Sequence, residues 1–69
     1  MGDWESYRIV TRVRRRVRGL VFEQAGGGFY VRIPLGPYAA KVSMFDSMKK
    51  LESFVRNRAW RLEKVRHFA

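Results

Sequence analysis

The chain has 69 residues, with 15 lysines and arginines against 6 aspartates and glutamates, a formal net charge of +9. It contains no cysteine, so neither a disulfide nor a thiolate metal site can stabilise it. A chain this short buries only a thin core, and it holds a single histidine, asparagine and glutamine. We therefore expect one small domain over residues 1–69, and no enzymatic activity, cofactor or bound metal.

The composition predicts a folded protein with a polyanionic partner. Hydrophobic residues make up 46% of the chain and aromatic residues 14%, which excludes a disordered basic tail. Eleven of the fifteen basic residues are arginine, and arginine suits bidentate contacts with phosphate and stacking on bases. Nucleic acid is the first expectation, followed by an acidic membrane surface and an acidic protein. A GC-rich genome produces the same arginine bias without any function, and this alternative stays open.

Residues 7–18 alternate between apolar and basic side chains, which predicts a strand, with a bend near residues 14–16 because twelve residues is long for one strand. On a strand, residues two apart lie about 6.6–6.8 Å apart on one face, close to the phosphate spacing of an extended single strand. The even positions are therefore the chief candidate for phosphate contact; we call them the arginine row: Arg8, Arg12, Arg14, Arg16 and Arg18. The alternatives are a solvated basic face and a face neutralised by another protein.

Residues 20–24 and 29–34 are predicted to form a hairpin around Gly26, Gly27 and Gly28, because glycine permits the positive φ angles of a tight turn. In the second arm Phe29, Val31 and Ile33 share one face, and Tyr30 and Arg32 share the other. Tyr30 and Arg32 are thus candidates for base stacking and phosphate contact, with Phe22 expected on the neighbouring strand. The alternative for Tyr30 is a half-buried strand residue. Residues 38–43 are predicted as a short fourth strand.

Residues 44–67 are predicted as one long helix, because no glycine or proline interrupts them and apolar residues recur every three or four positions. Ser43 is the expected N-cap, with Asp46 as the alternative. Met48, Leu51 and Val55 are expected in the core. A helix this long extends beyond four short strands, so its apolar stripe predicts a homodimer through the C-terminal helix, with Val55, Leu62, Val65 and Phe68 at the interface. His67, in the last turn, is expected to be exposed or to interact with the helix dipole.

These elements predict an α+β fold: a curved antiparallel sheet of three to four strands, followed by one long C-terminal helix packed on one face. The stretch Lys41-Val42-Ser43-Met44, leading into Phe45 to Leu51, resembles the strand-to-helix junction of the positive-cofactor-four type of single-stranded DNA-binding transcriptional coactivator. The resemblance covers about residues 20 to 55. It implies a dimer that holds single-stranded DNA on its sheet, with Arg32 and Lys41 on the binding face.

The predicted function is non-catalytic binding of single-stranded DNA or RNA with low sequence specificity. A small duplex-DNA-binding regulator or chromatin-type protein is an alternative. An assembly or inhibitor subunit that docks on an acidic protein is another. Because no apolar segment approaches the roughly 20 residues that span a bilayer, we expect no membrane partner and a cytoplasmic protein, nucleoid-associated if it binds DNA. The scarcity of Asn, Gln and Cys adds the expectation of a thermophilic source.

Overall fold

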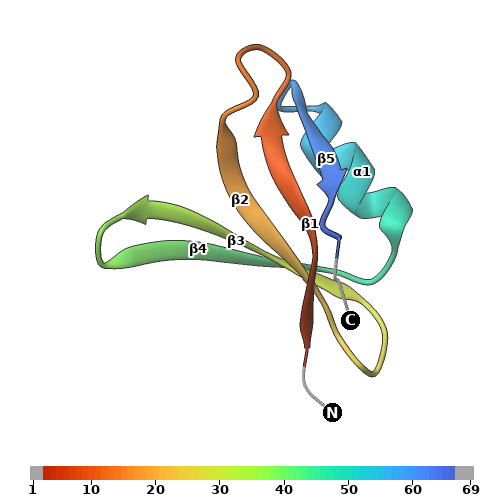
Figure 1. Ribbon diagram of the computed structural model, residues 1–69. Coiled ribbons are helices and arrows are strands. Elements are labelled where there is room, and N and C mark those ends of the chain that lie inside the picture. Colours follow the sequence, from red (N-terminus) through yellow and green to blue (C-terminus); the bar gives the residue numbers. More distant parts are fainter. Residues whose placement is uncertain (1–2, 67–69) are drawn as a thin grey trace.

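The computed structural model describes residues 3–66, and it shows a five-stranded antiparallel sheet with one short helix (Figure 1). The elements in chain order are β1 (Trp4–Thr11), β2 (Val17–Glu23), β3 (Phe29–Gly36), β4 (Ala39–Phe45), α1 (Met48–Arg56) and β5 (Trp60–Lys64). The strand order across the sheet is β4-β3-β2-β1-β5. The predicted fold class is therefore wrong, because the long C-terminal helix is replaced by α1 and by a strand that returns to pair with β1.

The helix begins later and ends earlier than predicted. Its N-cap is Ser47, whose hydroxyl accepts a hydrogen bond from the Lys50 amide, whereas the expected cap Ser43 lies within β4. At its other end the chain passes Asn57 and turns at Ala59, which adopts a left-handed conformation with φ 58°. Glycine is the usual residue there. The absence of glycine thus made the helix look continuous, although it has only nine residues.

Residues 60–64 form an edge strand because their side chains alternate once the helix has ended. Trp60 and Leu62 pack against the hydrophobic core, while Arg61 and Glu63 lie on the opposite face of β5. The pairing sets Leu62 opposite Ile9 and Glu63 opposite Arg8. The predicted dimer interface on a C-terminal helix is consequently wrong: Leu62 packs within its own chain, and Val65 follows β5 and donates its amide to the carbonyl of Ser6.

The arginine-rich stretch is a hairpin rather than one bent strand. The strand predicted over residues 7–18 ends at Thr11 and resumes at Val17, with residues 12–15 in a turn that the Thr11 amide closes by donating to the Arg16 carbonyl at 2.9 Å. The Thr11 hydroxyl donates to the Val13 carbonyl and accepts from the Arg16 amide. Arg14 and Arg15 have φ angles of 69° and 47°. The expected bend is therefore a complete chain reversal.

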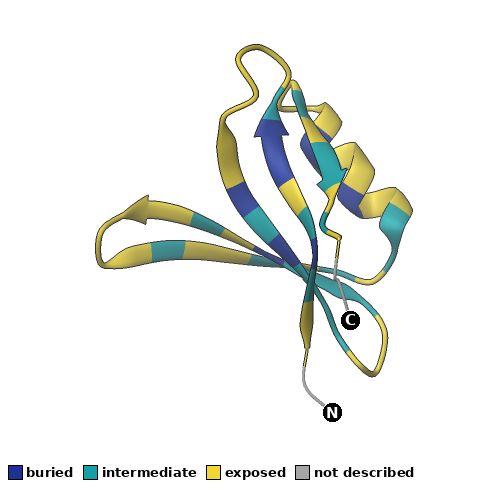
Figure 2. Cartoon of the chain, viewed as in Figure 1, coloured by how far each residue is buried: buried dark blue, intermediate teal, exposed yellow. Residues whose placement is uncertain are grey.

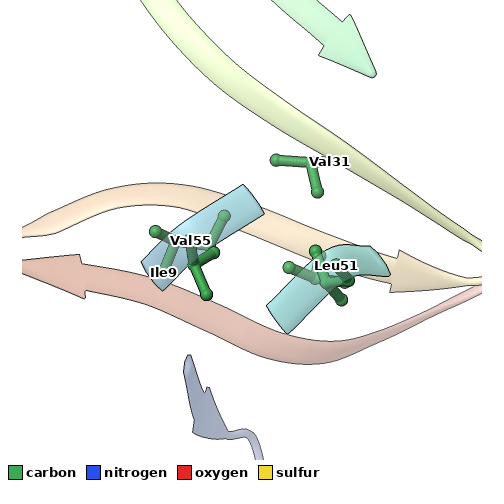
Figure 3. Close-up of a cluster of buried hydrophobic side chains, with 5 residues drawn as sticks. Ile9, Val31, Leu51 and Val55 are labelled. Carbon is green, nitrogen blue, oxygen red and sulfur yellow. The ribbon is translucent and has the colours of Figure 1, made fainter. Parts of the chain in front are cut away.

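The hydrophobic core lies between the sheet and α1 (Figure 3), and it consists of Ile9, Val21, Val31, Leu51 and Val55. Phe29 and Ile33 pack against this cluster, which confirms the predicted inward face of β3. The expected core residues of the helix are also confirmed, since Leu51 and Val55 are buried and Met48 packs against them. Val55 is only 4% exposed, so it cannot lie in an interface between two molecules.

The hairpin predicted around the three glycines is confirmed as β2–β3. The next hairpin, β3–β4, projects from the body of the protein (Figure 1). Gly27 and Gly28, between β2 and β3, have φ angles of 98° and 92°. Figure 1 shows β3 and β4 extending as an arm to one side of β1, β2 and β5, and Figure 2 shows that most of this arm is exposed. Within residues 3–66 no helix is long and apolar enough to cross a membrane.

Candidate nucleic-acid interface

The helix α1 covers one face of the sheet, and we call the opposite face the outer face; Val10 is buried on it, while Arg8, Arg32, Val42 and Met44 are exposed. The strand register sets two rows of side chains across it. One row contains Arg8, Leu20, Arg32 and Val42, and the other contains Glu5, Phe22, Tyr30 and Met44. Residues that lie directly opposite one another in neighbouring strands point to the same side of a sheet. Basic and aromatic side chains from three strands are thereby brought together.

Phe22 and Tyr30 form a stacked aromatic pair at the centre of the outer face. Their ring centroids are 5.0 Å apart and the planes differ by 17°. Both residues are half-buried, and partial burial together with the negative charge of Asp3, a hydrogen-bonding partner, raises the pKa of Tyr30 above its ordinary value of 10.0. Tyr30 is thus a neutral phenol at physiological pH. The expected proximity of Phe22 is confirmed.

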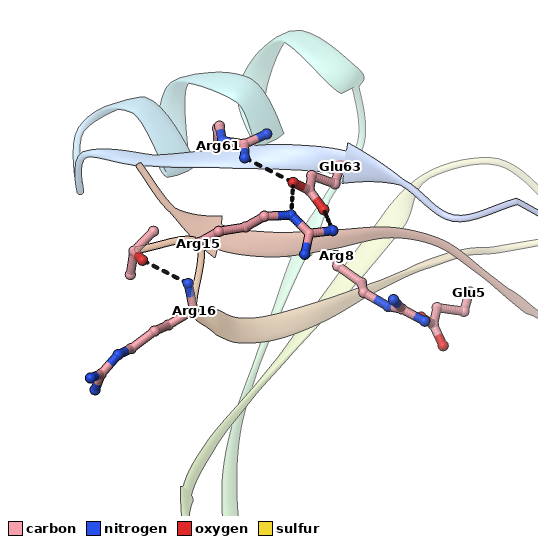
Figure 4. Close-up of polar contacts among 7 residues, drawn as sticks. Glu5, Arg8, Arg15, Arg16, Arg61 and Glu63 are labelled. Atoms are coloured by element: carbon pink, nitrogen blue, oxygen red, sulfur yellow. Dashed lines mark hydrogen bonds and ion pairs between the residues drawn. The ribbon is translucent and has the colours of Figure 1, made fainter. Parts of the chain in front are cut away.

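Two arginines, Arg8 and Arg32, flank this aromatic pair, and they differ in whether a carboxylate pairs with their charge. Arg32 is exposed, and no carboxylate in the described part of the chain lies within ion-pair distance of it. Arg8 has its Nε 3.4 Å from the Glu5 carboxylate, with its side chain 49% exposed (Figure 4). Arg32 therefore offers an unshared positive charge to a phosphate, whereas Arg8 already shares its charge with Glu5.

The other members of the arginine row do not continue along β1. Arg12, Arg14 and Arg16 are exposed at the end of the β1–β2 hairpin, where Arg12 donates to the carbonyl of Trp60 at 3.4 Å. Arg18 stands at a shift in the β1–β2 register, and its guanidinium lies 6.0 Å from the centroid of the Trp60 ring. The prediction that the arginine row continues along one strand is therefore wrong, and these arginines form a separate basic end of the molecule.

An ion cluster between the hairpin and β5 was missed by the sequence pattern. Arg15 donates two hydrogen bonds of 2.6 Å to the Glu63 carboxylate, and Arg61 approaches the same carboxylate at 2.8 Å (Figure 4). The Arg15 hydrogen bond, with the charges of both arginines, lowers the pKa of Glu63 below its ordinary value of 4.5. Arg15 breaks the alternation of residues 7–18, and that irregularity was the one available signal of a different role.

The remaining predicted site residues lie elsewhere. Lys41 is opposite Ile33, on the face of β4 that carries the core residue Phe45, so it does not share the outer face with Tyr30 and Arg32. The family resemblance implied one binding face for Arg32 and Lys41, whereas the register places these two residues on opposite faces of the sheet. Phe68 and His67 lie outside the described residues.

Comparison with known proteins does not distinguish between the expected partners, which are single-stranded nucleic acid, duplex DNA and an acidic protein. No protein-family model matches the chain, and neither a curated protein nor a solved structure matches it. The resemblance to the single-stranded DNA-binding coactivators therefore stays a hypothesis. Within residues 3–66 no group of three His, Cys, Asp or Glu side chains is arranged to hold a metal ion.

Proposed function

We propose that this protein binds single-stranded nucleic acid on the outer face of its sheet, with little sequence specificity. The observation that carries the proposal is the stacked pair of Phe22 and Tyr30 beside the unshared charge of Arg32, on a face that α1 leaves open. Aromatic rings accept any base by stacking, at about 1–3 kcal/mol per base, and cations beside them hold the backbone phosphates. A cytoplasmic location, on the nucleoid for a DNA ligand, goes with this proposal.

Exposed apolar side chains on the outer face also support the proposal. Val42 and Met44 continue the two rows and are 57% and 66% exposed, so the outer face combines apolar, aromatic and basic side chains, with the acidic residues Asp3 and Glu5 near Tyr30 and Phe22. A duplex hides its bases from such a surface, whereas a single strand presents them. We therefore favour a single strand over a duplex, with DNA and RNA both accommodated because stacking does not depend on the sugar.

The basic end of the molecule favours a second candidate function. Arg12, Arg14 and Arg16 protrude from the β1–β2 hairpin, where they could contact the phosphates of a duplex. In this alternative the hairpin arginines, rather than the aromatic pair, would determine affinity. The two candidates are separated by substitutions on the two surfaces.

Fluorescence anisotropy with labelled single-stranded DNA, duplex DNA and RNA, titrated across salt, tests the proposal. Arg32→Gln should weaken single-strand binding and reduce the slope of log K against log[salt] by about 0.7, the value for one phosphate contact. Lys41→Gln is the matched control, because it removes the same charge from the opposite face of the same hairpin. Tyr30→Leu should weaken binding by roughly 1–3 kcal/mol with an unchanged salt slope.

Three results would contradict the proposal. Equal losses for Arg32→Gln and Lys41→Gln would mean that only net charge matters. Loss of binding on Arg14→Gln and Arg16→Gln together, with Tyr30→Leu unaffected, would favour the duplex-binding hairpin. Weak binding to all three nucleic acids would indicate that the basic surface binds an acidic protein instead.

A further inference from the structure

The part of the β3–β4 hairpin from Ile33 to Phe45, which we call the β3–β4 arm, differs from the rest of the molecule in its charge. From Ile33 to Phe45 the only charged residue is Lys41, so 14 of the 15 lysines and arginines lie outside this segment. Its exposed apolar side chains are large: Leu35 is 68% exposed, Tyr38 100%, Val42 57% and Met44 66%. On a chain of net charge +9, this arm is where a second positively charged molecule can approach with the least repulsion.

The arm also ends in an open strand edge. Among the described residues 3–66, β4 is the outermost strand on its side of the sheet, so one row of its backbone donors and acceptors pairs with no strand of this part of the chain. The opposite edge, β5, has five residues, of which Arg61, Glu63 and Lys64 are charged. β4 has seven residues with one charge. Between the two edges, β4 is thus the better one for pairing with another strand.

We propose that a second copy of the chain pairs with β4 in antiparallel fashion, about a two-fold axis at Val42. A two-fold axis perpendicular to the sheet keeps each residue and its copy on the same side of the sheet. Because neighbouring residues of a strand point to opposite sides, the axis must lie between one residue and its own copy, and not between two successive residues. An axis at residue 42 pairs the whole strand, and it sets Lys41 opposite Ser43 of the partner subunit. An axis at residue 41 would instead oppose two lysines, which is unfavourable.

The proposed pairing would enlarge the candidate nucleic-acid interface, a consequence that rests on the function proposed above. Val42 belongs to the row that contains Arg8, Leu20 and Arg32. With the axis at Val42 this row would continue directly into the same row of the second copy. Three strand spacings would separate the two Arg32 positions, about 14 Å. Ten strands would then present one outer face with four arginines in a line.

Disulfide trapping in the absence of nucleic acid tests the pairing directly. The chain has no cysteine, and a residue on the axis lies about 4.5–5.5 Å from its own copy between Cα atoms, within the range that a disulfide spans. Val42→Cys should therefore cross-link under mild oxidation. Val17→Cys is the matched control, since Val17 is also 57% exposed but lies on β2. At about 10 μM protein, pairing should make the first reaction on the order of a hundred-fold faster.

Light scattering across protein concentration provides the second measurement. The unmodified chain should be dimeric at high concentration, and Val42→Lys should be monomeric because it opposes two lysines on the axis, whereas Val17→Lys should remain dimeric. A monomer at every concentration, or equal cross-linking of the two cysteine variants, would overturn the pairing. Neither result bears on nucleic-acid binding by one copy. Conversely, a dimer that fails to bind any nucleic acid would refute the proposed function and leave the pairing intact.

Discussion

At the scale of single residues, the Glu63 carboxylate joins two parts of the chain that are distant in sequence. It accepts hydrogen bonds from Arg15 in the β1–β2 hairpin and lies 2.8 Å from Arg61 in its own strand. The side chain of Glu63 is only 19% exposed, and a bidentate pair of this geometry is stronger than an ordinary surface ion pair. Arg15 therefore positions the hairpin, and the exposed arginines beside it remain available to a ligand.

The lowered pKa of Glu63 predicts a specific dependence of stability on pH. Because the carboxylate is favoured in the folded state, its contribution is fully present above about pH 4.5 and is lost as the pH falls through the lower folded value. Glu63→Gln should lower Tm at pH 7, and the difference from the unmodified protein should shrink toward pH 3. Thermal unfolding followed by circular dichroism at several pH values measures this. A difference that stays constant with pH would show that the carboxylate charge is not what stabilises the hairpin.

At the scale of elements, the end of α1 carries a residue that is poorly suited to its conformation. Ala59 has φ 58°, and its amide donates to the carbonyl of Arg56 in the turn that leads to β5. Glycine adopts this conformation without the steric cost that a Cβ imposes. Ala59→Gly should therefore stabilise the protein by about 1 kcal/mol, which corresponds to roughly 4–8 °C in Tm for a domain of this size.

Urea unfolding of Ala59→Gly measures that gain, with Ala25→Gly as the control. Ala25 is also exposed but has no positive φ, so its replacement should be neutral or slightly destabilising because glycine adds conformational freedom to the unfolded chain. Equal effects of the two substitutions would indicate that Ala59 carries no strain.

Local patterns predicted the central strands but not the return of the chain. The alternation in β3 identified Val31 as inward and Arg32 as outward, because a strand with one buried face has apolar residues at every second position. The end of α1 and the start of β5, within residues 57–64, could not be predicted in the same way. Leu51 and Val55 fit a helical spacing that continues through Leu62. Residues 60–64 form a strand because their backbone pairs with the free edge of β1. That edge exists only in the folded sheet.

The candidate site shows the same limit. Tyr30 and Arg32 were found from their strand alone, whereas the position of Lys41 depends on the register between β3 and β4. A shift of one residue in that register reverses the face of every side chain. The arginine row failed for a related reason: two consecutive left-handed residues, Arg14 and Arg15, turn the chain where the alternation of arginine and valine favours a continuous strand.

At the scale of the whole molecule, the net charge of +9 opposes folding while it attracts polyanions. The principal-axis extents are only 34 × 29 × 26 Å, so 15 cationic side chains share a small volume. Two unit charges about 7 Å apart repel by about 0.6 kcal/mol in water, before salt screens them. The hairpin arginines and the start of β2 hold several such charges close together, and Glu63 offsets only part of them.

Salt should consequently move stability and binding in opposite directions. Raising NaCl from 0.05 to 0.5 M should stabilise the free protein by on the order of 1 kcal/mol, because the screening length falls well below the size of the molecule. The same change should weaken a nucleic-acid complex, since bound phosphates release condensed counterions. Thermal unfolding and anisotropy on one salt series measure both effects. If Tm instead falls with salt, the ion pairs around Glu63 outweigh the repulsion among the arginines. Arg14→Gln distinguishes the two cases, because it removes repulsion without touching the Glu63 cluster and should reduce the salt dependence of Tm only where repulsion dominates.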